Sequence, residues 1–105
     1  DINEALVMMA AADKIRRACN SIGGRLFKAQ KFAGDLKEAA RARGYSDAEI
    51  DAYLGSKAER AKVRARRNVY FETQGASNLD PQSLCVLGQA EIARKSQIGA
   101  FLRAK

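Results

Sequence analysis

Helix-start signals recur along this chain and divide it into short helical segments. The stretches 46–49 and 56–59 read Ser-Asp-Ala-Glu and Ser-Lys-Ala-Glu, and both have the form of a capping box. Asp80-Pro81 combines an N-cap residue with a proline at the first helical position. Because Pro81 is the only proline, the segments between these signals are free to remain helical throughout. The sequence therefore predicts an all-α protein.

Apolar residues recur at helical spacing between these signals. A first helix is predicted from an N-cap at Asn3 to about Arg17, and a second from a cap at Ser21 to Gly44, with Gly23-Gly24 in its first turn. Further helices are predicted over 46–55, 56–74 and 80–95, with a short one from 96. The predicted apolar stripes are Ala5, Met8, Ala12, Ile15 and Cys19 in the first helix and Ile22, Leu26, Ala29, Ala33, Leu36 and Ala40 in the second. We expect one domain, residues 1–105, folded as a small bundle of four to five helices with antiparallel neighbours.

Histidine is absent from the sequence, which removes most ordinary catalytic and metal chemistry. No Ser–His or Cys–His pair can form, two cysteines alone do not complete a zinc site, and no glycine-rich phosphate loop is present. Most carboxylates stand at helix starts or on polar faces, where capping or solvation explains them. Glu91 lies among apolar residues one turn before Arg94, and we interpret it as half of a structural ion pair. We therefore predict a protein that is not an enzyme and has no cofactor and no metal.

Basic residues dominate the charge of the chain, with a net charge of +7 and a pI of about 9.8. Lys57, Arg60, Arg64 and Arg67 fall on one face of the predicted helix 56–74. This face is either a solvated surface or a docking surface for an acidic partner. Nucleic acid is a weaker alternative, because no motif for reading bases is present. The four residues are the predicted partner-binding site.

Cys19 and Cys85 are the only cysteines and are 66 residues apart. They could be free thiols in the core or a bridge between two helices, and a bridge would indicate an oxidising compartment. A redox motif is not expected, because the Cys-x-x-Cys spacing is absent. The longest apolar run, residues 5–12, is too short to span a membrane. The chain starts without methionine, so we expect an N-terminus produced by cleavage.

The stretch 85–99, Cys-Val-Leu-Gly-Gln-Ala-Glu-Ile-Ala-Arg-Lys-Ser-Gln-Ile-Gly, resembles the signature of a family of small exported bacterial proteins of unknown function. The segments 44–50 and 15–19 are similar to the same family. The resemblance implies a mature periplasmic chain with a Cys19–Cys85 bridge, and it implies no activity or substrate. We expect a non-enzymatic periplasmic binding or accessory protein, such as a small subunit docked on a larger envelope or membrane complex. The alternative is a cytosolic basic helical protein that binds nucleic acid.

Overall fold

The computed structural model describes residues 2–105 and has six helices and one two-stranded sheet in that range. The helices are α1 (Ile2–Ala18), α2 (Leu26–Ala42), α3 (Asp47–Gly55), α4 (Lys57–Thr73), α5 (Pro81–Ala93) and α6 (Gln97–Ala100). The strands are β1 (Ile22–Gly24) and β2 (Leu102–Ala104). The predicted all-α bundle is confirmed, and the small sheet is an addition to it.

The predicted N-caps account for most of the helix starts. Ser46 and Glu49 form a complete capping box at α3, and the Ser56 hydroxyl accepts a hydrogen bond from the backbone amide of Glu59 at α4. The Asp80 carboxylate accepts from two amides of the first turn of α5. The predicted cap at Asn3 is wrong, because α1 already includes Ile2 and Asn3 therefore lies inside the helix. The hydrogen bonds to Ser46, Ser56 and Asp80 satisfy first-turn amides that have no partner within their own helix.

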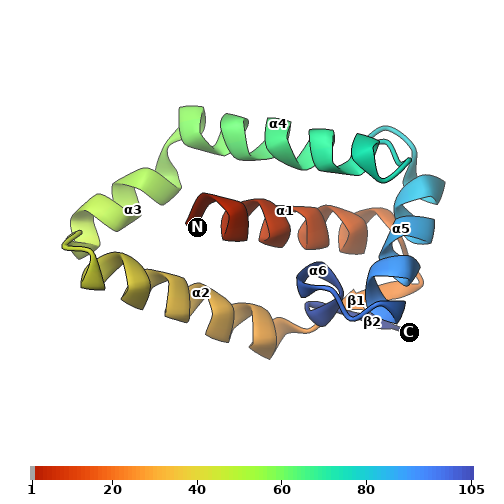
Figure 1. Ribbon diagram of the computed structural model, residues 1–105, viewed down its shortest axis with the longest axis horizontal. Coiled ribbons are helices and arrows are strands. Elements are labelled where there is room, and N and C mark those ends of the chain that lie inside the picture. Colours follow the sequence, from red (N-terminus) through yellow and green to blue (C-terminus); the bar gives the residue numbers. More distant parts are fainter. Residues whose placement is uncertain (1) are drawn as a thin grey trace.

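Helix α1 lies in the middle of the molecule, with α4 on one side and α2 on the other (Figure 1). Helix α3 joins α2 to α4 at one end, and α5, α6 and the sheet gather at the opposite end (Figure 1). Helices α1 and α4 run in the same direction, which corrects the expectation of antiparallel neighbours throughout. The reason is that α2 and α3 carry the chain back along the molecule before α4 begins, so α4 repeats the direction of α1.

The apolar core forms where α1, α4, α5, α6 and the sheet meet. Ile15, Phe71 and Leu84 are completely buried there, and the α1 stripe faces them. Two glycines permit close packing, Gly99 against the backbone of α5 and Gly88 against isoleucine side chains. A Cβ added to Gly99 would lie 2.1 Å from the carbonyl oxygen of Glu91, and one added to Gly88 would lie 2.7 Å from an Ile15 methyl. The short helix α6 can therefore lie directly on the backbone of α5.

The two strands clamp the C-terminal segment onto the chain just after α1. They pair antiparallel, with Gly23 opposite Arg103, and the amide of Lys105 donates to the carbonyl of Ser21. The prediction that Gly23 and Gly24 occupy the first turn of a helix is wrong. A glycine in a helix interior lowers helix stability by about 1 kcal/mol relative to alanine. At Gly23 and Gly24 the backbone instead forms the paired hydrogen bonds of a strand.

Helix α2 is amphipathic but buries little of its apolar face. Ala40 is its only buried residue, and Ala29, Ala33 and Leu36 of the predicted stripe are half-buried. Leu26 is 65% exposed and is the one stripe residue that the structure leaves in solvent. Phe32 attaches the helix to the core by an edge-to-face contact with Phe101, with ring centroids 4.9 Å apart. The adjacent Phe27 is 85% exposed. Helix α2 thus lies along the core rather than within it.

A disulfide joins Cys19, just after α1, to Cys85 in α5, with their Cα atoms 5.3 Å apart. The predicted bridge between the first helix and the C-terminal helical region is confirmed. Disulfides persist in oxidising compartments, so the bridge suggests a non-cytosolic environment. Within residues 2–105, no helix has the length and apolar character needed to cross a bilayer.

Candidate functional site

The predicted basic face lies along α4, and the structure divides it into two parts. Lys57, Arg60 and Arg64 are exposed. This agrees with their spacing of three and four residues, which places them on one side of the helix. Arg67, one turn further on, is only 7% exposed. The helix therefore presents three cations to solvent and holds the fourth within the protein.

The intramolecular ion pairs leave this face uncompensated. The flanking cations of α4 are neutralised, since Lys62 pairs with Glu59 at 3.2 Å and Arg66 pairs with Glu4 at 2.8 Å. The ion pairs of the described part of the chain include none of the predicted residues, Lys57, Arg60, Arg64 and Arg67. Arg60 donates instead to the carbonyl oxygen of Leu54 at 2.8 Å. The positive charge of the face is thus available to an external anion.

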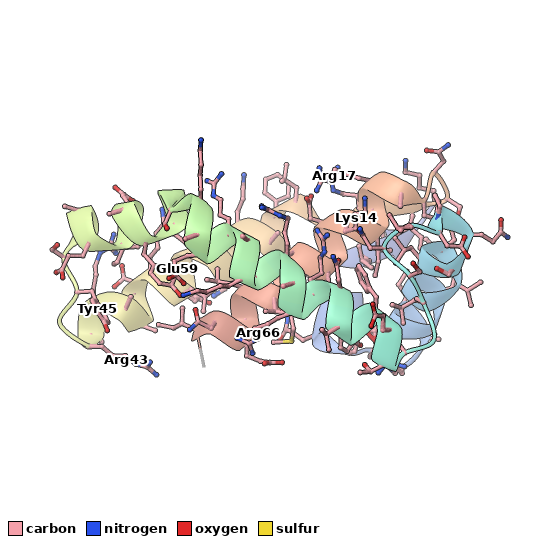
Figure 2. All side chains as sticks on the ribbon, turned by 90° about the horizontal axis from the view of Figure 1, so that it is seen from above. Lys14, Arg17, Arg43, Tyr45, Glu59 and Arg66 are labelled. Atoms are coloured by element: carbon pink, nitrogen blue, oxygen red, sulfur yellow. A yellow bond between two sulfur atoms is a disulfide. The ribbon has the colours of Figure 1, made fainter. Side chains whose placement is uncertain are left out.

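A groove of about 410 Å³ lies beside this face, between α1, α3 and α4. Its lining combines apolar residues with four arginines, one of them from α1. The lining residues are Leu6, Ala10, Asp13, Arg17, Tyr53, Leu54, Glu59, Arg60, Val63, Arg64 and Arg67. Figure 2 shows Arg17 on one edge of α4 and Arg66 on the opposite edge. The groove therefore lies on the side where α1 adds a further cation to those of α4.

Arg67 is held in the wall of this groove by neutral partners. Its Nε donates to the side-chain oxygen of Asn68 at 3.0 Å, and one terminal nitrogen donates to that of Asn78 at 3.2 Å. The guanidinium also lies 5.9 Å from the centre of the Phe71 ring. Burial lowers the pKa of Arg67, and the positive charges of Arg17 and Arg64 lower this pKa further. A buried arginine without a carboxylate partner is unusual, because burial of a charge is costly unless the charge is paired.

A second groove, of about 520 Å³, lies on the other side of α4 and has Glu91 at its base. The Glu91 side chain is fully buried, and both of its oxygens accept from the Tyr70 hydroxyl, at 3.0 and 2.9 Å. Arg94 forms an ion pair with the same carboxylate, and Ser96 donates to it at 3.2 Å. The predicted ion pair of Glu91 is confirmed. Because Tyr70, Arg94 and Ser96 all bond to this carboxylate, we read it as a structural centre that joins α4, α5 and α6.

Sequence reasoning missed the contribution of Arg17 to the basic surface. Arg17 belongs to α1, and only the parallel contact of α1 with α4 brings it near Arg64 and Arg67. No residue pattern within either helix carries that information. Residues 2–105 contain no group of three or more Cys, Asp or Glu side chains placed to hold a metal ion.

Comparison with known proteins gives one match. No curated protein and no solved structure is significantly similar to this chain. A protein family described as a family of unknown function, DUF5333, matches residues 1–103. This match covers both cysteines, the whole basic face and the Glu91 network. The chain therefore belongs to the DUF5333 family.

Proposed function

We propose that this protein is a non-enzymatic binding or accessory module of the bacterial periplasm, which docks on an acidic surface of a larger envelope or membrane complex through α4. The observation that carries the proposal is the distribution of ion pairs. The chain neutralises the cations at the margins of the face and leaves Lys57, Arg60 and Arg64 exposed without a carboxylate partner. Complementary charge on a partner would steer encounter and fix orientation.

The disulfide supports the location in this proposal. A Cys19–Cys85 bridge suits a compartment that keeps thiols oxidised, and the bacterial periplasm is such a compartment. The same bridge weighs against a cytosolic protein that binds nucleic acid. The high net charge is compatible with either partner, so the partner has to be identified by experiment.

The test is crosslinking capture from the native envelope with a triple charge-reversal variant, Lys57→Glu, Arg60→Glu and Arg64→Glu. A matched control carries Lys28→Glu, Lys37→Glu and Arg43→Glu, which change the net charge equally at exposed positions of the α2 region. We expect capture of a specific envelope protein to be lost in the first variant and kept in the control. Equal capture by both variants would refute the proposed docking face.

A binding assay with duplex DNA at physiological salt tests the competing reading. Affinity for nucleic acid that depends on counterion release falls steeply as salt rises. We expect no binding under these conditions. Tight binding with a steep salt dependence, abolished by the triple charge reversal, would replace the acidic protein partner with nucleic acid.

A further inference from the structure

The groove beside α4 has two chemically different ends. Helices α1 and α4 run in parallel, so their earlier residues share one end of the groove and their later residues share the other (Figure 1). The first end combines the apolar side chains of Leu6 and Leu54 with Glu59 and Arg60, and Val63 lies between the two ends. The second end carries Arg17, Arg64 and Arg67. An occupant that fits both ends has an apolar part and an anionic part.

The cationic end contains one side chain that is built into the fold rather than free on the surface. The Arg67 residue is only 7% exposed, and its contacts with Asn68, Asn78 and Phe71 fix the plane of its guanidinium. Its Nε and one terminal nitrogen are occupied by the two asparagines. No buried side-chain nitrogen of the described residues lacks a partner, so the other terminal nitrogen of Arg67, which has none, is accessible to solvent. Because Arg67 lines the groove, this nitrogen is the donor available to an acceptor there.

The acidic residues that line the groove form ion pairs with residues other than Arg64 and Arg67. Asp13 is the carboxylate of α1 that lines the groove, and it pairs with Arg16 and, at 3.0 Å, with Arg17. Glu59, the other acidic residue of the lining, pairs with Lys62. Arg64 and Arg67 therefore form no ion pair, and repulsion from the nearby charges of Arg17 and Arg64 lowers the pKa of Arg67, although Asp13 partly opposes this effect. An incoming carboxylate would relieve that repulsion.

We propose that the cationic end of this groove is a carboxylate-binding subsite, in which Arg67 and Arg64, with Arg17 at the rim, receive an acidic side chain from a protein segment whose apolar neighbour occupies the other end. This inference rests on the proposed function and specifies the chemistry of the contact. The exposed guanidinium of Arg64 can bind a carboxylate through two parallel hydrogen bonds, and the remaining terminal nitrogen of Arg67 adds a donor whose direction a lysine could not reproduce. The apolar side chains of Leu6 and Leu54 at the other end favour a protein segment over a free inorganic anion, because a free anion has no apolar part to place there.

The test uses a blocked hexapeptide of alternating leucine and glutamate and a matched peptide with glutamine in place of glutamate. Binding to the full oxidised chain is measured by calorimetry and by amide and arginine side-chain resonances in NMR. We expect the glutamate peptide to bind and to shift the Arg67 Nε resonance, and the glutamine peptide to bind at least tenfold more weakly, since hydrogen bonds to a charged acceptor are stronger than those to a neutral one. Equal affinity of the two peptides would overturn the subsite.

Three variants locate the contact. Arg67→Lys keeps the charge but loses the planar donor, and Arg64→Gln removes a charge from an exposed position where folding is not at risk. We expect each to weaken the glutamate peptide roughly tenfold. Lys57→Gln, which lies on the same face but outside the groove lining, should change the affinity less than threefold. An equal loss in all three variants would mean diffuse charge attraction and no defined subsite.

Two further measurements separate the subsite from the proposed function. Inorganic phosphate at millimolar concentration is titrated against the same resonances, and a shift at Arg67 with displacement of the peptide would reassign the site to phosphate groups. Arg67→Lys is also tested in the envelope capture. Capture that survives in this variant but not in the triple charge reversal would refute the subsite and leave the docking face in place. Because the triple reversal includes Arg64, capture that it leaves unaffected would refute both the docking face and the subsite as contacts with the envelope partner, even if the peptide binds.

Discussion

Reduction of the Cys19–Cys85 bridge should cost this protein a large part of its stability. The bridge closes a loop of 66 residues. In the chain-entropy account, such a cross-link lowers the entropy of the unfolded chain by an amount equal to about 4 kcal/mol at 25 °C. Domains of this size have a total free energy of unfolding of roughly 5–15 kcal/mol. The reduced protein should therefore remain folded at low temperature and lose most of its resistance to denaturant.

Urea unfolding with and without reductant measures this effect directly. For a slope of about 2 kcal/mol per molar, the midpoint should fall by about 2 M on reduction, and the melting temperature by roughly 15 °C or more. A variant with Cys19→Ala and Cys85→Ala should behave like the reduced protein and should not respond to reductant. If the oxidised and reduced proteins differ by less than about 1 kcal/mol, the reasoning fails, because the unfolded chain would then already be restricted without the bridge.

Two other predictions concern local features of the fold. Gly99→Ala should destabilise the protein by about 3 kcal/mol in urea unfolding, because the added Cβ meets the fixed backbone of Glu91. The control Gly34→Ala lies in helix α2, where the added Cβ has nothing within 4 Å, and it should stabilise the protein by about 0.5–1 kcal/mol. A Gly99→Ala protein as stable as wild type would contradict the close packing of α6 on α5. The hydrogen bond from the Ser46 amide lowers the pKa of Glu49 in the folded state. The ionised Glu49 side chain therefore contributes fully to the stability of the fold above its ordinary pKa of about 4.5, and this contribution is lost as pH falls through the lowered pKa. Melting curves between pH 3 and 7 should show wild type losing stability at the acidic end relative to Glu49→Gln, which keeps an acceptor but does not titrate, and parallel curves would refute this.

Local signals in the sequence predicted the helices well because caps act through neighbouring residues. The hydroxyls of Ser46 and Ser56 and the carboxylate of Asp80 accept hydrogen bonds from amides two or three residues further along the chain. Each cap therefore depends only on a few consecutive residues. The same holds for Gly75, whose positive φ of 76° ends α4 where the sequence predicts. The identity of the cysteine bridge also followed, since only one pair exists.

Features that depend on distant segments did not follow from the sequence. Strand β1 pairs with a strand about 80 residues away, and neither three-residue segment has a pattern that differs from a loop or a helix start. Helix α2 has the apolar stripe of a core helix, yet Leu26 and Phe27 remain exposed. Periodicity predicts which face of a helix can be buried, but the amount of core available to cover that face is a property of the whole fold.

Arg67 shows how this limit bears on function. It lies on the same face of the helix as Arg64, yet it is buried and donates to Asn78 in the segment after α4, a contact that the helix pattern does not predict. A solvent-exposed arginine at this position would not lower the stability of the fold. A buried arginine without a carboxylate partner lowers the stability of the unbound protein. Such a cost is expected where binding recovers it, because a fixed and partly desolvated charge attracts an anion more strongly than a hydrated one. The buried member of the basic face thus adds an indication of a binding site that solvation does not explain to the one given by its three exposed neighbours, which form no ion pair.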